Sequence, residues 1–342
     1  MSLFNSLEAI FDSFNQLTVL VVGDVMIDSY LWGKSSRLSP EAPVPIVNVV
    51  RKEKRLGGAA NVALNVQALG ATPLLCAVIG EDFAGAELLR LMEEQQLPTD
   101  GMVKSPDRIT TVKERIMAGG QQLLRIDAEI ETELLEHESA YLVQQYSKLL
   151  PLADVVVFED YDKGVLTGAN IAAMLELARQ HDIPTVVDPK KKNFLSYVGC
   201  TLFKPNLKEL KEGLKVDFAD TNHVAFEQAA LTLQKKLNTP IVLITLSERG
   251  VFYLTGPDKK YMAAHLRTIS DVSGAGDTVI SIAALCLALD LPIAFLAGLS
   301  NLGGGLVCEQ IGVVPIDKGN LLAEAQRTNT FQLVNTSPVI KI

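Results

Sequence analysis

The sequence predicts an α/β fold in which helices cover both faces of a mostly parallel central sheet, with a small β-sheet lid attached to it. Short, continuous apolar runs alternate with segments of helix-forming residues along most of the chain. Such runs are typical of strands buried on both faces, and their alternation with helices indicates parallel strands. Two segments in which apolar and polar residues alternate interrupt this order and predict the lid.

The elements of the central sheet follow one another from residue 17 onward. A strand is predicted over 17–22, an apolar, β-branched run, and a helix over 59–69, where Gly70 favours a stop. The same pattern continues along the chain. Further strands are predicted over 74–79, 154–158, 185–187 and 241–246, and further helices over 84–96, 168–181 and 223–237.

The lid is predicted from two segments, about 30–50 and 110–126. The first is rich in proline and ends in the alternating run 44–50, and the second contains a hairpin turn at 118–121. Neither segment resembles a crossover helix. A small sheet of this kind could cover a binding site, and its open edge could pair with a second copy of the chain to give a homodimer.

Composition limits the partners and the compartment. The 31 basic residues are outnumbered by 40 acidic ones, and the net charge of −9 argues against nonspecific nucleic-acid binding. The longest apolar run, 278–289, is too short to cross a bilayer, and the N-terminal residues lack the pattern of a signal peptide. We therefore expect a cytoplasmic protein without nucleic-acid or membrane partners. One domain is expected over 1–327, including the lid segments, followed by a tail over 328–342.

The sharpest motif is DVSGAGDT, which begins at Asp271. Its glycine-rich turn, Gly274-Ala275-Gly276, leads into an apolar helix, and the free N–H groups at a helix start bind anions such as phosphate. Asp277 would lie beside this anion site and could take a proton from an attacking hydroxyl group. The alternative is a glycine turn in which the aspartate only caps the helix.

Glycines and polar residues also follow the first predicted strand and precede the first predicted helix. Gly57 and Gly58 allow a ligand to approach the backbone, and Asn61 can donate to and accept from hydroxyl groups. Asp24 and Asp28 lie beyond the first strand, where open α/β sheets bind ligands, and carboxylates are good acceptors for sugar hydroxyls. The alternatives are close helix–sheet packing for the glycines and turn formation or capping for the aspartates.

A third motif, Asn206-Leu207-Lys208-Glu209, follows a predicted strand over 201–204. Asn206 and Glu209 are three residues apart and share one side of a first helical turn. Together they could hold a hydrated Mg²⁺ beside phosphate groups, because Mg²⁺ keeps several of its waters and needs few protein ligands. The alternative is a capping box, in which the two side chains satisfy the backbone at the helix start.

Taken together and in this order, the motifs resemble the ribokinase, or PfkB, family of carbohydrate kinases over about residues 17–327. Within this range, five segments are closely similar to the members of the family that phosphorylate D-glycero-β-D-manno-heptose 7-phosphate. These segments are 23–28 (GDVMID), 37–45 (RLSPEAPVP), 56–62 (LGGAANV), 160–166 (DYDKGVL) and 188–190 (DPK). The resemblance implies a ribokinase-like fold and a kinase that uses ATP and Mg²⁺.

The resemblance also implies roles for individual residues. Asp277 matches the catalytic base of the family, and 274–276 matches its anion hole. The segment 206–209 matches the part that lies near the ATP phosphates, with Glu209 holding Mg²⁺ through water. The remaining matches are Ser247, Arg249 and Gly250 near the nucleotide, and Asp24, Gly57, Gly58 and Asn61 on the sugar side.

A phosphorylated sugar needs cations, and the candidates lie beyond predicted strands or on the lid. Lys163 and Lys190 follow predicted strands, whose ends face the ligand in open α/β sheets. Lys113 and Arg115 are two residues apart and therefore lie on one face of a lid strand, and Arg37 is a further lid candidate. For each of them taken alone, a solvated surface charge is the alternative.

The resemblance thus implies transfer of the γ-phosphoryl group of ATP to the anomeric hydroxyl of the heptose 7-phosphate, a step towards ADP-heptose and lipopolysaccharide. A kinase of the same family for another sugar, sugar phosphate or nucleoside is one alternative. A non-catalytic sensor of nucleotide or sugar is another, from a different class. The intact motif around Asp277 argues against the sensor, because such a protein has no need of a base.

Overall fold

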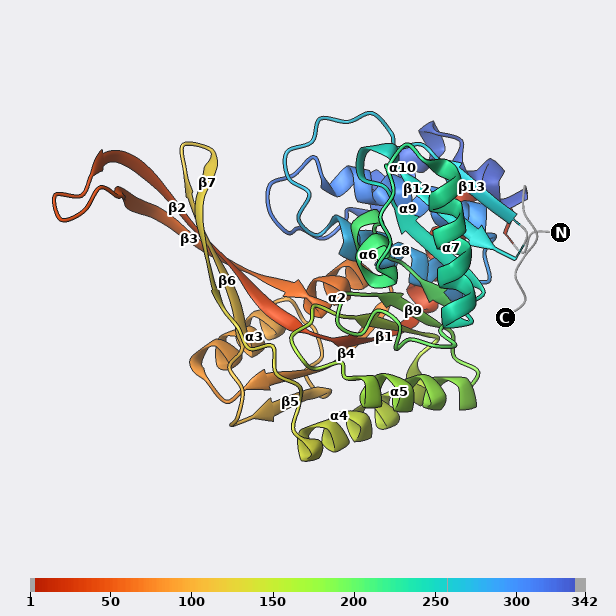
Figure 1. The fold of residues 1–342 in the computed structure, drawn as a ribbon, viewed down its shortest axis with the longest axis horizontal. Helices are drawn as coiled ribbons and strands as arrows, with labels where there is room; N and C mark the ends of the chain where they lie inside the picture. The colour runs from red at the N-terminus through yellow and green to blue at the C-terminus, as the bar shows by residue number, and fades with distance from the viewer. Residues whose placement is uncertain (1–3, 257, 336–342) are drawn as a thin grey trace.

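A nine-stranded sheet forms the centre of the structure, a computed structural model that describes residues 4–256 and 258–335 (Figure 1). The strand order is β13-β12-β11-β10-β9-β8-β1-β4-β5. Strands from β11 to β5 are parallel to their neighbours, whereas β12 and β13 run antiparallel. The bounds are β1 Thr18–Gly23, β4 Thr72–Gly80, β5 Met102–Ser105, β8 Val155–Glu159, β9 Thr185–Asp188, β10 Leu202–Phe203, β11 Ile241–Thr245, β12 Val251–Thr255 and β13 Asp258–Met262.

Helices cover both faces of this sheet, as the alternating side chains of β1 show. Val19 and Val21 pack into one apolar core, and Leu20 and Val22 pack into the other. The first core includes α1 Leu7–Ser13, α2 Ala59–Ala68, α3 Phe83–Glu94, α8 Ala275–Ala288, α9 Ile293–Val307 and α10 Lys318–Arg327. The second includes α4 Glu136–Leu149, α5 Gly168–Gln180, α6 Leu207–Leu214 and α7 His223–Leu237. The predicted central architecture is confirmed.

A second, four-stranded sheet extends from the body as two long hairpins (Figure 1). It contains β2 Val25–Leu38, β3 Pro45–Gly58, β6 Thr111–Ala118 and β7 Gln121–Ala128, in the order β3-β2-β6-β7. β2 is antiparallel to β3 and parallel to β6, and β6 is antiparallel to β7. We call this sheet the lid. Its inner end is buried over Val25–Tyr30, whereas β7 is exposed along its whole length.

Short 3-10 helices complete the described chain. They are η1 Phe14–Gln16, η2 Leu150–Leu152, η3 Ser247–Arg249 and η4 Thr330–Asn335. In η4 the side chain of Val334 joins the first core, so this part of the predicted tail packs on the body. Residues 336–342 of the predicted tail lie outside the described residues. No helix in the described ranges combines the length and the apolar character that crossing a membrane requires.

Candidate active site

Three adjacent strands carry charged residues at their carboxyl ends. Glu159 ends β8 and Asp188 ends β9, and the two residues are direct neighbours in the parallel register. Lys204 follows β10, and its N–H donates to the carbonyl of Val187. All three side chains are almost completely buried, and Lys204 Nζ lies 2.8 Å from Asp188 Oδ2. The edge of the sheet where open α/β folds bind ligands is therefore lined by buried charges.

The glycine-rich turn lies over these strand ends. Gly274 has a φ of +81°, a left-handed conformation that suits glycine, and it caps α8. A Cβ atom added at Gly276 would lie 3.5 Å from Asp188 Oδ2 and 3.7 Å from Lys204 Nζ. The N–H groups of the first helical turn have no acceptor within the helix, so the turn offers donors to an anion directly above the buried charges.

Asp277 lies in the first turn of α8 and is held from both sides. Its Oδ2 accepts a 2.6 Å hydrogen bond from Asn61 Nδ2, and its Oδ1 accepts a 3.0 Å bond from the hydroxyl of Tyr161. Burial raises the pKa of Asp277, and the hydrogen bonds from Asn61 and Tyr161 act in the opposite direction. A fixed carboxylate of raised basicity beside an anion site can accept a proton from a substrate hydroxyl.

Asp24 positions the loop that carries Tyr161. Its carboxylate accepts hydrogen bonds from the backbone N–H groups of Tyr161, Lys163 and Val165, and burial raises its pKa against the effect of these bonds. Its carbonyl oxygen accepts from Ala59 N at the start of α2. Both carboxylate oxygens of Asp24 thus accept hydrogen bonds from backbone N–H groups. This matches the alternative of turn formation and capping for Asp24, rather than a contact with sugar.

The two glycines before α2 bring the lid strand close to the aspartates. Gly58 has a φ of +60°, and a Cβ added there would lie 2.4 Å from the carbonyl oxygen of Asp24. A Cβ at Gly57 would lie 2.3 Å from Asp28 Oδ2. Asp28 in turn pairs with Arg115 on the neighbouring lid strand β6. Close packing of the backbone, the alternative for these glycines, is therefore present in the structure.

Asn206 and Glu209 form a capping box at the start of α6. Asn206 Oδ1 accepts from Glu209 N at 2.9 Å, and Glu209 Oε2 accepts from Asn206 N at 2.8 Å. Glu209 Oε1 accepts from Lys190 Nζ at 2.9 Å, and this ammonium also lies over the ring of Tyr161. Leu207 is half-buried and Lys208 is exposed. The motif therefore orders the helix start and holds Lys190 near Tyr161.

The three residues predicted near the nucleotide lie beyond β11, next to this helix. Asn206 forms a bridge with Thr245, the last residue of β11, and η3 follows with Ser247 and Arg249. Gly250 has a φ of +90°, and a Cβ there would lie 2.1 Å from the carbonyl oxygen of Met262, so this position requires glycine. Arg249 Nη1 donates to the carbonyl of Asp220. The structure thus brings 206–209 and 247–250 to one edge.

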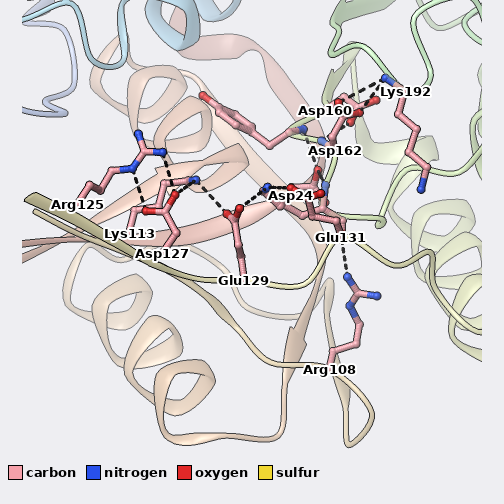
Figure 2. Close-up of polar contacts among 12 residues, drawn as sticks. Asp24, Arg108, Lys113, Arg125, Asp127, Glu129, Glu131, Asp160, Asp162 and Lys192 are labelled. Carbon is pink, nitrogen blue, oxygen red and sulfur yellow. Dashed lines mark hydrogen bonds and ion pairs between the residues drawn. The ribbon is translucent and has the colours of Figure 1, made fainter.

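The lid cations are already paired with acidic residues (Figure 2). Lys113 Nζ lies 3.0 Å from Glu129 and 3.5 Å from Asp127. Lys163, on the loop after β8, pairs with Glu129 at 2.8 Å and with Glu131 at 2.7 Å. Arg37 is exposed near the outer end of β2, away from the buried inner end of the lid. A substrate phosphate must exchange places with a carboxylate to reach Lys113 or Lys163.

Sequence reasoning did not single out Tyr161, Glu159 or Lys204. Tyr161 lies in the quoted segment DYDKGVL, and Lys204 directly precedes Pro205 and the Asn206 motif. Glu159 lies one residue and Tyr161 three residues beyond the predicted strand 154–158, and Lys204 ends the predicted strand 201–204. This position at a strand end is the signal that could have identified them. No local pattern shows that these side chains turn inward to the same point.

Comparison with known proteins identifies the family. The model of the pfkB family of carbohydrate kinases matches residues 16–318. The chain belongs to this family. It is 37% identical to the bifunctional protein HldE of Syntrophotalea carbinolica over 91% of its own length and 64% of that protein, and 38% identical to HldE of Trichlorobacter lovleyi over 92% and 64%. The predicted family is confirmed, and the chain spans about 64% of the length of these relatives.

Solved structures support the fold. Phosphofructokinase-2 from Escherichia coli, in complex with potassium, has a TM-score of 0.77 at 18% identity, covering 91% of this chain and 100% of that one. Its tetrameric inhibited form has a TM-score of 0.75 at 18% identity with the same coverage. The ribokinase-like α/β fold predicted from the sequence is confirmed by this likeness, which at such identity concerns the fold alone.

Proposed function

We propose that this member of the family is a cytoplasmic, ATP-dependent kinase of D-glycero-β-D-manno-heptose 7-phosphate, which it converts to the 1,7-bisphosphate for ADP-heptose and lipopolysaccharide synthesis. The family supports phosphoryl transfer to a sugar. The choice of sugar rests on the similarity of five segments, above all RLSPEAPVP and DYDKG. The identity of about 37% to HldE proteins over most of the chain agrees with it.

The observation that carries the proposal is the position of Asp277 between two donors beside the glycine turn. In the proposed reaction Asp277 takes the proton of the anomeric hydroxyl. The oxygen then bonds to the γ-phosphorus of ATP while the bond from that phosphorus to the bridging oxygen breaks and ADP leaves. The N–H groups of 274–277 would stabilise the charge on the transferring group. Asn61 and Tyr161 keep the base aimed at one point.

The nucleotide is proposed to lie over 206–209 and 247–250, with its phosphates directed at the start of α8. The acidic side chains at this edge suit the divalent ion that accompanies ATP, because Mg²⁺ prefers carboxylate oxygens and retained waters. Glu209 would hold it from the rim, and when bound the ion supplies positive charge to the phosphate oxygens. Lys190 pairs with Glu209 in this structure. Once Glu209 holds the ion, Lys190 would leave this pair and contact an ATP phosphate.

The far-end phosphate of the sugar needs a different cation. Lys190 lies 5.0 Å from the ring centre of Tyr161, whose hydroxyl reaches Asp277, so it belongs to the reacting end. We assign the 7-phosphate to the lid, with Arg115 as its principal contact. Arg115 pairs with Asp28, which lies beside Gly57, one of the residues matched to the sugar-binding part of the family. The guanidinium of Arg115 also lies over the ring of Tyr30.

A substrate panel with ATP tests the proposed function. The purified chain is incubated with heptose 7-phosphate, free heptose, ribose, fructose 1-phosphate and a nucleoside, and products are identified by mass spectrometry and phosphorus NMR. A new anomeric phosphate on heptose 7-phosphate, formed faster than any other product, is expected. Preference for another acceptor would contradict the assignment of the sugar, and no ATP consumption with any acceptor would favour a sensor.

We also propose that two copies of the chain pair through the lid. β3 and β7 are the edge strands of its sheet, and apolar side chains are exposed on both. These are Val49, Val50, Leu123, Leu124 and Ile126. Sedimentation of wild type and Leu124→Asp tests the pairing. A dimer that becomes a monomer in the variant supports it, and a monomeric wild type refutes it.

A further inference from the structure

The segment that follows α9 lies between the lid and the glycine turn. It comprises residues 308–313, and we call it the bridging segment. Its residue Gly312 has a φ of +77°, and a Cβ added there would lie 2.7 Å from Arg55 Nη1 and 3.1 Å from the hydroxyl oxygen of Tyr30. Glycine at this position therefore allows two lid side chains to approach the backbone of the bridging segment closely.

Arg55, near the inner end of β3, holds the bridging segment by two hydrogen bonds. Its Nη1 donates to the carbonyl oxygens of Ile311 at 3.1 Å and Val313 at 3.0 Å. The hydroxyl of Tyr30 accepts from Val313 N at 3.4 Å, and Arg55 Cζ lies 5.3 Å from the centre of the Tyr30 ring. Glu53 accepts from Arg55 Nε at 2.7 Å. A guanidinium carries several donors in one rigid plane, so it can fix two carbonyls and a carboxylate at once.

The bridging segment also holds Asp271, the first residue of the DVSGAGDT motif. The N–H of Gly312 donates to Asp271 Oδ2 at 2.9 Å, and the N–H of Asp271 donates to the carbonyl of Cys308 at 3.2 Å. Asp271 Oδ1 accepts from the N–H of Ser273 at 3.0 Å and from its hydroxyl at 2.8 Å, directly before Gly274. The start of the glycine turn is therefore fastened to the same segment that the lid holds.

We propose that Arg55 is a positioning residue that sets the glycine turn through the bridging segment, and that it thereby links the lid to the site of phosphoryl transfer. This role rests on the proposed function, in which the N–H groups of 274–277 receive the transferring group. These groups stabilise the charge only when they point at it, and a small displacement of a preorganised site lowers the rate strongly. The turn is thus in place only while the inner end of the lid contacts the bridging segment.

Arg51 offers a matched control, because it shares the surroundings of Arg55 but not the contact at issue. It lies on β3, four residues from Arg55, and an even spacing places both side chains on the same face of a strand. It pairs with the same Glu53 at 3.3 Å and lies over the ring of Trp32. Within the part of the chain that the structure describes, no hydrogen bond joins Arg51 to the bridging segment.

Amide hydrogen exchange of the ligand-free chain, measured by mass spectrometry, tests the link. In Arg55→Met, peptides covering 308–313 and 271–278 are expected to exchange faster than in wild type, by about fivefold or more, because the carbonyls of the bridging segment lose their donor. Arg51→Met should exchange as wild type does in both peptides. Exchange in β8, at the centre of the sheet, should be unchanged in both variants, which shows that the chain stays folded.

Steady-state kinetics with the sugar that the substrate panel selects provide a second measurement. Arg55→Met should lower kcat by roughly tenfold with little change in the KM for sugar or ATP, because a misplaced turn weakens stabilisation of the transition state rather than binding. Arg51→Met should change neither quantity. Should Arg55→Met fail to fold, Arg55→Lys is expected to show smaller changes in the same direction, because its ammonium keeps the charge but not the planar set of donors.

Unchanged exchange over 271–278 in Arg55→Met, or an equal increase in Arg51→Met, would overturn the proposal. A higher KM at an unaltered kcat would also overturn it, since Arg55 would then be a contact for a substrate. The exchange measurement needs neither sugar nor ATP. A chain that phosphorylates no acceptor would therefore refute the proposed function, while exchange would still decide whether the lid and the turn are linked.

Discussion

The carboxyl edge of the central sheet and the lid both carry many charged side chains, but they hold them differently. At the edge, Glu159, Asp188 and Lys204 are 0%, 4% and 3% exposed. In the lid, the side chains of Asp127 and Glu129 remain 21% exposed and take part in pairs with lysines (Figure 2). The edge lies between two apolar cores, whereas β7 is exposed along its length.

The difference indicates a division of labour. Charges in a low-dielectric interior interact strongly, and they can move only if the packing around them changes. Exposed ion pairs contribute little and exchange partners easily. The edge is therefore suited to fix the reacting atoms. In the lid, Lys113 is suited to leave its partly exposed partners for a substrate phosphate, whereas Arg115 is held by the buried Asp28.

The largest effect is expected from the base itself. Asp277→Asn keeps the shape of the side chain but cannot accept the proton, so kcat should fall by roughly 10²–10⁴ while ATP binding is retained. Steady-state kinetics and nucleotide titration measure both. Asp290→Asn, an exposed change in the turn just after the same helix, should leave kcat unaltered. Wild-type turnover in Asp277→Asn would place the chemistry elsewhere.

Stability should depend on pH in opposite ways in the two regions. Burial and the charge of Asp24 raise the pKa of Asp160, at the edge, from 3.8 to about 7. The folded state keeps this proton while the unfolded state releases it, so the contribution of Asp160 to stability is complete below about pH 4 and is lost as the pH rises to about 7. The free energy of unfolding of Asp160→Asn should therefore rise relative to that of wild type over this pH range, by at most about 4 kcal/mol.

The lid aspartate Asp127 is the comparison for Asp160. Partial burial acts against ionisation there, but Arg125 and Lys113 outweigh it and lower the pKa. Its contribution is present above the unfolded pKa and is lost as the pH falls, so Asp127→Asn should cost less than about 1 kcal/mol at neutral pH. Urea unfolding at pH 3, pH 5 and pH 8 measures both variants: the gain of Asp160→Asn should grow from pH 5 to pH 8, whereas the cost of Asp127→Asn should shrink only towards pH 3. The same pH trend in both would remove the contrast between the regions.

Substitution of Arg115 should affect the sugar phosphate, and substitution of Lys190 should affect ATP. Arg115→Met should lower kcat/KM for the phosphorylated sugar by roughly 10- to 100-fold, since a charge-assisted contact is worth about 1.5–3 kcal/mol. Lys190→Met should affect the KM for ATP instead. Arg125→Met, on the lid strand opposite Arg115, is the control and should change neither. Equal losses on both substrates in Arg115→Met would show that this residue serves the fold or the nucleotide.

The smallest effect is expected at the hydroxyl that holds the base. Tyr161→Phe removes one hydrogen-bond donor to Asp277. Because that hydrogen bond lowers the pKa of Asp277, the variant should have a higher Asp277 pKa than wild type. The acidic limb of the kcat profile should move to higher pH by up to about one unit. Tyr141→Phe, an exposed change on α4, should leave the limb in place. An unmoved limb in Tyr161→Phe would mean that Asp277 does not set it.

Local patterns were sufficient for much of the fold. The predicted helix 223–237 has the observed bounds, and the predicted strand 185–187 lacks only Asp188. The amphipathic helix α4 was not predicted. Neither was α9, although Ile293–Val307 is almost entirely apolar. A helix that is buried all round has no polar face and so shows no helical period, which is the signal that sequence reasoning uses.

For the candidate site, the sequence was sufficient to predict the glycine turn and the helix start that carries Asp277, because such a start is encoded within eight residues. The role of Asp277 as a base stays a prediction. Only the tertiary structure decided which side chains meet there. Asn61 on α2 and Asp277 on α8 are 216 residues apart, and Tyr161 joins them from the loop after β8. It also decided that Lys163, Lys190 and Arg115 each face a carboxylate. A charged side chain takes the nearest opposite charge in space, and closure of the whole sheet sets that distance.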